Sequence, residues 1–284
     1  MTVLTGLAAL VVAQAAPAGA TQAGQPWRPV VMAALGDSIS AGFNACGWYV
    51  TCASHSWSTG DHRDVRSHYL RLREADVALA GHNVNLAVPG STSADLAGQV
   101  KQAIDRRADY VTVLVGAQDA CASEERLMTS VAVYESRVAG ALALLRTARP
   151  DARVFVASIP DLRRLWQAGR NNLVARGFWA VGRICPTVLA HPTSTSAADQ
   201  ARRDRVRARV IGFNAALARV CAVYGPNCRF DGNEVFRQAF TLSHISMWDF
   251  FHPNAAGQRL IAEKTYGAMR DWLAEDDREP VLAP

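Results

Sequence analysis

Short apolar runs alternate along the chain with longer segments of helical periodicity. Four of the runs are apolar almost throughout, as expected for strands that helices cover on both faces of a sheet, and a fifth is weaker. They span residues 30–35, 84–88, 110–115, 154–159 and, for the weaker one, 228–230. Strands that alternate with helices in this way predict an α/β protein with a central parallel sheet.

Three segments place apolar side chains at the spacing of one helix face, namely residues 127–145, 206–224 and 254–272. Asn254 is a favourable N-cap for the last of them. Residues 161–196 have no clean period and are interpreted as an insertion over the sheet. Because no repeat or long low-complexity linker interrupts the pattern, we expect a single domain.

The composition argues against a disordered chain or a membrane bundle, since 50% of the 284 residues are hydrophobic and 19% are charged. The net charge of +5 comes from 30 basic and 25 acidic residues, too small an excess to indicate nucleic-acid binding. Five arginines in the second helical segment are expected to form a solvated face, because Asp199 and Asp204 are close enough to pair with some of them. They are Arg202, Arg203, Arg205, Arg207 and Arg209.

A group of histidines and aspartates near the N-terminal half of the chain has a spacing that matches no standard metal-ligand pattern. It consists of His55, Asp61, His62, Asp64 and His68. We therefore expect no metal site there, and nothing else in the sequence indicates a cofactor.

The first 20 residues contain no charged side chain, and residues 4–16 are apolar almost throughout. This run is too short to span a bilayer, which needs about 20 residues. It precedes small residues ending at Ala20, so residues 1–20 are interpreted as a signal peptide and residues 21–284 as the mature domain. No basic residue precedes the run, and the alternative is an Ala-rich terminus without a targeting role.

All the cysteines lie beyond this segment, and their even number fits disulfides formed in an oxidising compartment. Pairing Cys46 with Cys52 and Cys221 with Cys228 would close two short loops and leave Cys121 with Cys185. The sequence alone leaves this connectivity open.

The first candidate catalytic motif along the chain is Gly36-Asp37-Ser38, directly after the first apolar run. A serine at a strand-to-helix turn lies at the carboxyl edge of the sheet, where open α/β proteins place their ligands. Its own N–H group, at a helix N-terminus, is free to face a developing negative charge. The tripeptide alone is weak support, because it also occurs by chance.

Asp249 and His252 precede the last helical segment. Serine is a poor nucleophile unless a base, usually histidine, accepts its proton, and a third group orients that base. An aspartate three residues before a histidine can reach its ring on one tight turn. Alone, the pair would be interpreted as a turn and capping motif; with Ser38, it becomes a candidate base and orienting acid.

Two further segments follow strand candidates. Gly90 lacks a side chain that would block its N–H group, and Gln118 offers a side-chain amide. Together with the N–H group of Ser38, these donors would form an oxyanion hole for a tetrahedral acyl intermediate.

These motifs resemble the conserved blocks of the GDSL/SGNH hydrolases, and more closely those of secreted actinobacterial esterases and lipases. The blocks are Gly36-Asp37-Ser38-Ile39-Ser40, Gly90, Gly116-Ala117-Gln118-Asp119 and Asp249-x-x-His252-Pro253, within residues 31–269. The resemblance implies a three-layer α/β/α sandwich around a five-stranded parallel sheet, the flavodoxin-like SGNH hydrolase fold. It implies Ser38 as nucleophile, His252 as base and Asp249 as its partner, with backbone oxyanion donors at Ser38 and Gly90. The secreted branch often carries three disulfides.

Gln118 stands where the family has asparagine, so the same NH₂ donor sits on a longer side chain. We expect a secreted, monomeric carboxylesterase or lipase that forms an acyl-enzyme without a metal or cofactor. Its partners would be small-molecule, lipid or glycan esters, with no nucleic acid and no stable membrane anchor. The alternatives are a carbohydrate acetylesterase, with Trp48, Trp57 and Trp248 stacked on sugars, a long-chain lipase or phospholipase, and a binding protein weakened in catalysis at Gln118.

Overall fold

The computed structural model describes residues 27–275, so the predicted signal segment at residues 1–20 lies outside the described residues. In this part of the chain, five parallel strands form one sheet in the order β2-β1-β3-β4-β5. The strands are β1 Met32–Gly36, β2 Asn83–Asn85, β3 Tyr110–Leu114, β4 Arg153–Val156 and β5 Cys228–Phe230. The predicted parallel α/β sheet is confirmed.

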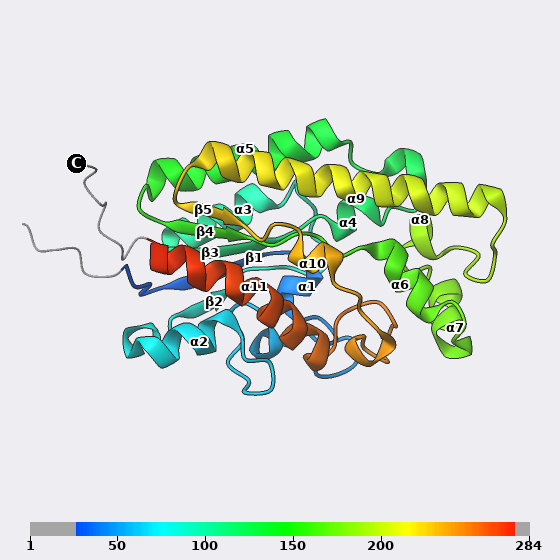
Figure 1. The fold of residues 1–284 in the computed structure, drawn as a ribbon, viewed down its shortest axis with the longest axis horizontal. Helices are drawn as coiled ribbons and strands as arrows, with labels where there is room; N and C mark the ends of the chain where they lie inside the picture. Colours follow the sequence, from blue (N-terminus) through cyan, green and yellow to red (C-terminus); the bar gives the residue numbers. More distant parts are fainter. Residues whose placement is uncertain (1–26, 276–284) are drawn as a thin grey trace, which may run out of the picture.

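Helices cover both faces of the sheet and make a three-layer α/β/α sandwich (Figure 1). The helices α3, α5 and α9 lie on one face, and α2 and α11 lie on the other. The α-helices are α1 Ser38–Ala41, α2 His68–Ala75, α3 Leu96–Asp105, α4 Ala117–Ala120, α5 Val131–Ala148, α6 Leu162–Gly169, α7 Leu173–Val181, α8 Pro186–Leu189, α9 Ala197–Tyr224, α10 Glu234–Arg237 and α11 Ala255–Glu275. Because both faces are covered, β1, β3 and β4 are buried at every position.

Four short 3₁₀ turns complete the described chain: η1 Ala53–His55, η2 Val77–Leu79, η3 Glu125–Leu127 and η4 Leu242–His244. No helix within residues 27–275 combines the length and the apolar character that crossing a membrane requires.

The three predicted helical segments correspond to α5, α9 and α11. Asn254 precedes α11, and its side chain accepts the N–H of Gly257 at 3.0 Å, as an N-cap does. Helix α9 begins earlier than its apolar stripe, because Ser196 caps it by accepting the N–H of Asp199. The apolar stripe therefore located these helices better than it located their first residues.

The sequence analysis was wrong about the extent of the second strand and about the position of residues 161–196. The second strand covers only Asn83–Asn85, because it is an edge strand with half-buried residues. Residues 161–196 do not lie over the sheet but form α6, α7 and α8 beyond one end of it (Figure 1). These helices have 8, 9 and 4 residues, too short to produce a clear period.

The carboxyl ends of β1 and β3 form the part of the sheet edge that bears Ser38. Gly36 ends β1 with a φ of +137°, and a Cβ atom there would lie 1.9 Å from the carbonyl oxygen of Leu114 in β3. Any other residue would push the two central strands apart. Glycine therefore allows the chain to turn sharply into α1, which starts at Ser38.

Candidate active site

A chain of hydrogen bonds joins three side chains at the carboxyl edge of the sheet. The Oγ atom of Ser38 lies 2.7 Å from Nε2 of His252. The Nδ1 atom of the same ring lies 2.5 Å from Oδ2 of Asp249. Ser38 opens α1, while Asp249 and His252 share the turn before α11, so the fold brings together residues that are far apart in the sequence.

Asp249 is held as a charged acceptor. Its Oδ1 atom accepts the backbone N–H groups of Phe251 at 2.8 Å and of His252 at 3.0 Å. Burial disfavours the carboxylate, but the hydrogen bond from the His252 ring, the charge of that ring and the two N–H groups outweigh it. They hold the pKa of Asp249 below its usual value. The carboxylate thus orients Nδ1–H toward itself and Nε2 toward Ser38.

Asn44 also belongs to this cluster, and the sequence analysis missed it. Its Nδ2 group donates to Oδ2 of Asp249 at 2.6 Å, the oxygen that also contacts His252. Asn44 is 1% exposed and has a φ of +57°, a left-handed conformation that asparagine tolerates better than most residues. Its position soon after Ser38 was the only signal, and that signal is shared by any asparagine in a turn.

One cavity of about 280 Å³ is lined by Ser38, Gly90, Gln118 and His252. Gly90 follows Pro89 in a turn and has a φ of +86°, the pattern of a type II turn. Gln118 is an exposed residue of α4. The structure thus brings the three predicted oxyanion donors to the same cavity as the hydrogen-bonded chain.

The turn at Gly90 is fixed by buried hydrogen bonds from two helices. Gln99 of α3 donates to Oγ of Ser91 at 3.2 Å. Asp119 of α4 accepts the N–H and hydroxyl of Ser93, at 2.8 and 2.7 Å. Because Asp119 directly follows Gln118 in α4, these bonds fix the Gly90 turn relative to the helix that bears Gln118.

Asp37 links α1 to α4 beneath the cavity. Its carboxylate accepts the N–H of Ile39 at 3.0 Å and the N–H of Ala117 at 3.3 Å. Burial raises the pKa of Asp37 to about 6, against the opposing effects of these N–H groups and of the charge on His252. Asp37 is therefore a buried residue whose hydrogen bonds connect the two helices, and it lies outside the chain of hydrogen bonds that starts at Ser38.

Three disulfides join the pairs considered in the sequence analysis: Cys46–Cys52, Cys121–Cys185 and Cys221–Cys228. The second one bears on the site, because both of its cysteines line the cavity. It covalently joins the residue after α4 to the residue before α8. This bond holds residues 183–186, which form part of the cavity wall, against the sheet edge.

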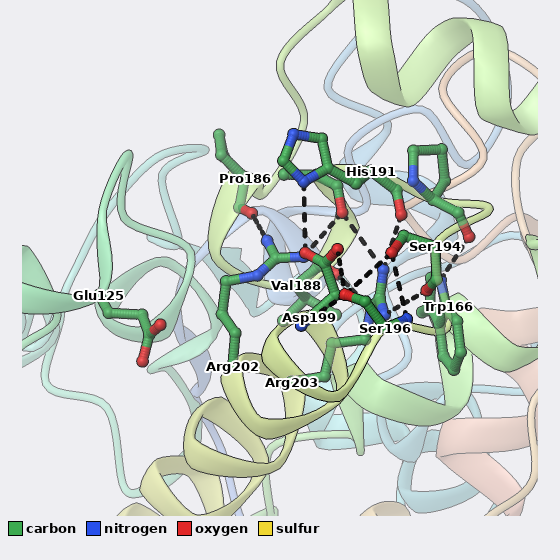
Figure 2. A network of polar contacts seen from close by, with 12 residues as sticks. Glu125, Trp166, Pro186, Val188, His191, Ser194, Ser196, Asp199, Arg202 and Arg203 are labelled. Carbon is green, nitrogen blue, oxygen red and sulfur yellow. Dashed lines mark hydrogen bonds and ion pairs between the residues drawn. The ribbon is translucent and has the colours of Figure 1, made fainter.

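Figure 2 shows the polar network that ties the segment around α8 to α9. Arg203 is fully buried and stacks on Trp166, with 4.0 Å between the guanidinium carbon and the ring centroid. Arg202 donates to the carbonyl oxygen of Pro186 at 2.8 Å, next to the cavity. Arg203 donates to four backbone carbonyl groups, those of Val188, Ala190, His191 and Ser194. The prediction that the arginines form a solvated face is therefore wrong for Arg203, and also for Arg202, whose side chain is 15% exposed. Both side chains satisfy carbonyl groups of a segment with little regular structure.

The histidine and aspartate group does not form one cluster. His68 is buried, with its ring nitrogens 3.2 Å from the Tyr110 hydroxyl and 2.7 Å from Oγ1 of Thr265. Burial, together with the charge of Arg71, lowers the pKa of His68 to about 3, so this ring is a neutral part of the core. Within residues 27–275, no group of three or more His, Cys, Asp or Glu residues is arranged to hold a metal ion.

Comparisons with known proteins agree with the fold. The sequence profile of the GDSL-like lipase/acylhydrolase family matches residues 34–260. A protein of Parabacteroides merdae described as a GDSL-like lipase has a similar structure, with a TM-score of 0.54 and 15% identity over 86% of this chain and 96% of that chain. A family 3 carbohydrate esterase of Clostridium thermocellum gives a TM-score of 0.51 and 15% identity over 87% of this chain and 99% of that chain.

An extracellular lipase of Streptomyces rimosus is also among the similar structures, with a TM-score of 0.47 and 16% identity over 84% of this chain and 98% of that chain. No curated protein matches the sequence significantly. The two structures with the higher TM-scores show a shared fold.

Proposed function

Because the chain belongs to the GDSL-like lipase/acylhydrolase family, we propose that it is a secreted serine ester hydrolase of the carboxylesterase or lipase type. The observation that carries the proposal is the hydrogen-bonded chain from Ser38 through His252 to Asp249, beside a cavity that Gly90 and Gln118 also line. Residues 1–20 would direct export and residues 21–284 would form the mature domain. The disulfides fit an oxidising compartment.

The proposed reaction proceeds in two halves. Ser38 Oγ attacks the ester carbonyl carbon while Nε2 of His252 takes the hydroxyl proton, and Asp249 stabilises the imidazolium that forms. The tetrahedral intermediate collapses when His252 returns this proton to the leaving alcohol, which leaves an acyl group on Ser38. A water molecule, deprotonated by the same ring, then attacks the acyl-enzyme and releases the acid.

The oxyanion of each tetrahedral intermediate would be held by the backbone N–H groups of Ser38 and Gly90 and by the side-chain NH₂ of Gln118. Such donors act at the position where charge develops, and they need no reorganisation during the reaction. The buried ties at Ser93–Asp119 and Ser91–Gln99 support this role, because they limit the movement of the Gly90 turn.

The substrate preference is tested by measuring kcat/KM for soluble esters that differ in acyl length and for an acetylated polysaccharide. We expect the highest kcat/KM with simple short-chain esters, because the cavity is only about 280 Å³ and Phe43, Ile184 and Phe251 contribute apolar groups to its lining. A preference for the polysaccharide would favour the carbohydrate acetylesterase alternative. Of the tryptophans considered for sugar stacking, Trp57 is fully buried, while Trp48 and Trp248 are exposed.

Gln118 provides a test of the oxyanion hole. Gln118→Asn is expected to match or raise kcat, because it restores the shorter donor of the family. Gln118→Ala is expected to lower kcat by about 10²- to 10³-fold, the usual cost of losing one oxyanion donor. The side chain is exposed, so neither change should lower the melting temperature. An alanine variant as active as the parent would exclude position 118 from the oxyanion hole.

A further inference from the structure

Helix α7 presents apolar side chains to solvent beside the cavity. Leu173 is 75% exposed and Val181 is 88% exposed, and Val174 and Phe178 are exposed as well. The only buried residues of the helix are Ala175 and Trp179. A helix of a water-soluble protein normally turns its apolar stripe inward. Helix α7 instead has apolar side chains on its buried face and on its exposed face, a pattern typical of a helix whose outer face binds an apolar partner.

The charge around α7 narrows the identity of that partner. Between Asp161 and Asp199 the sequence contains five arginines and no acidic residue. Arg164 pairs with Asp161, but no ion pair among residues 27–275 involves Arg176 or Arg183, which lie in α7 and just after it. An outward apolar face with unpaired cationic side chains is typical of helices that lie on anionic lipid surfaces.

Helix α7 is attached directly to the candidate active site. The indole N–H of Trp179 donates to the carbonyl oxygen of Phe250 at 3.0 Å, two residues before His252. The rings of Phe178 and Phe250 lie 5.6 Å apart. After the helix ends, Arg183 contributes to the cavity wall. A molecule bound on the outer face of α7 would therefore lie next to the cavity that Ser38 lines.

A second exposed apolar group borders the same cavity. The loop closed by the Cys46–Cys52 disulfide exposes Trp48, Tyr49 and Val50. The Tyr49 ring lies 5.8 Å from that of Phe43, which lines the cavity and lies 5.0 Å from the ring of His252. Exposed apolar side chains from two separate segments thus contact residues at or next to the cavity, Phe43 in one case and Phe250 in the other.

We propose that α7 and residues 48–50 form a docking surface that binds reversibly to an anionic phospholipid bilayer. Apolar side chains would enter the interface, and Arg176 and Arg183 would contact the headgroups. This inference goes beyond ester hydrolysis, because docking requires neither Ser38 nor turnover. It identifies a partner surface and places the cavity at the lipid–water boundary.

The test uses the mature protein with Ser38→Ala, so that vesicles are not consumed, in a sedimentation assay. Vesicles of phosphatidylcholine with about one-third phosphatidylglycerol are compared with vesicles of phosphatidylcholine alone. We expect binding to the anionic vesicles that weakens as salt is raised. Leu173→Ser with Val181→Ser should weaken it by about 10-fold or more, because two apolar side chains no longer leave water. Arg176→Gln with Arg183→Gln should weaken only the binding to anionic vesicles.

Val223→Ser is the matched control, because Val223 is 75% exposed on α9 and does not line the cavity. It should bind vesicles like the parent protein. The proposal is overturned if the parent protein does not bind the anionic vesicles, if it binds both kinds of vesicle equally well, or if Val223→Ser weakens binding as much as the α7 double variant. It is also overturned if the α7 variant instead dissociates a dimer seen by light scattering, which would make α7 a self-association face. Failure of Ser38 to hydrolyse esters would leave the vesicle result unaffected.

Discussion

Ser38→Ala is expected to lower kcat for ester hydrolysis by about 10⁴- to 10⁶-fold while the fold is preserved. The substitution removes the proposed nucleophile, and no other hydroxyl group of residues 27–275 is hydrogen-bonded to Nε2 of His252. The start of α1 is untouched, because Asp37 supplies its N-cap by accepting the N–H of Ile39. Steady-state kinetics with a soluble ester measures the loss, and thermal unfolding checks the fold.

Ser40→Ala is the matched control for this change. Ser40 lies in the same short helix, but its hydroxyl is fully buried and contacts the carbonyl oxygen of Leu114 at 3.4 Å rather than His252. The kcat of the Ser40→Ala variant should remain within a few-fold of the parent's. Comparable losses in both variants would indicate that α1 is damaged in general, and an active Ser38→Ala protein would exclude Ser38 as the nucleophile.

Asp249→Asn is expected to lower kcat by about 10³- to 10⁴-fold with little change in KM. An amide that turns its NH₂ group toward Nδ1 favours the ring tautomer with the proton on Nε2, which can no longer accept a proton from Ser38. The Oδ1 position can still accept the N–H groups of Phe251 and His252, so the turn should remain folded. The values of kcat and KM are measured for the variant and the parent protein, and thermal unfolding checks that the variant is folded.

Asn44→Gly is expected to lower kcat less than Asp249→Asn does. Glycine readily adopts the positive φ of position 44, so the substitution removes the donor to Asp249 without straining the backbone. A hydrogen bond to a charged group contributes about 1.5–3 kcal/mol, so a loss of kcat of about 10-fold or more is expected.

If Asp249→Asn were as active as the parent, another group would have to orient His252.

The central layer of the fold could be predicted because its signal is local. The runs that became β1, β3 and β4 are buried on both faces, so each is apolar at most of its positions, whatever residues surround it in the sequence. Ser38, Asp249 and His252 were also named from the sequence, because each lies in a short motif after a strand or before a helix. Their proximity follows from the parallel sheet, which gathers such motifs at one edge.

Other features depend on partners that are distant in the sequence. Asn44 contacts Asp249, and Arg203 contacts the segment around α8, so neither role is visible in the neighbouring residues. In the sequence, Arg203 resembles Arg205, which is exposed on α9, yet Arg203 is buried against Trp166. The helices α6 to α8 were missed because their short lengths leave no clear period. The capping residues Asp161 and Asn172 were local signs of α6 and α7 only, since α8 has no side-chain cap.

The central claim is that Ser38 is an activated nucleophile, and covalent labelling tests it most directly. The protein is treated with a fluorophosphonate, digested, and the adduct located by mass spectrometry, with Ser38→Ala treated in parallel. The account predicts one adduct, on the peptide that contains Ser38, and none on the variant. A protein that hydrolyses esters but carries no adduct at Ser38, or a variant that is labelled to the same extent, would contradict it.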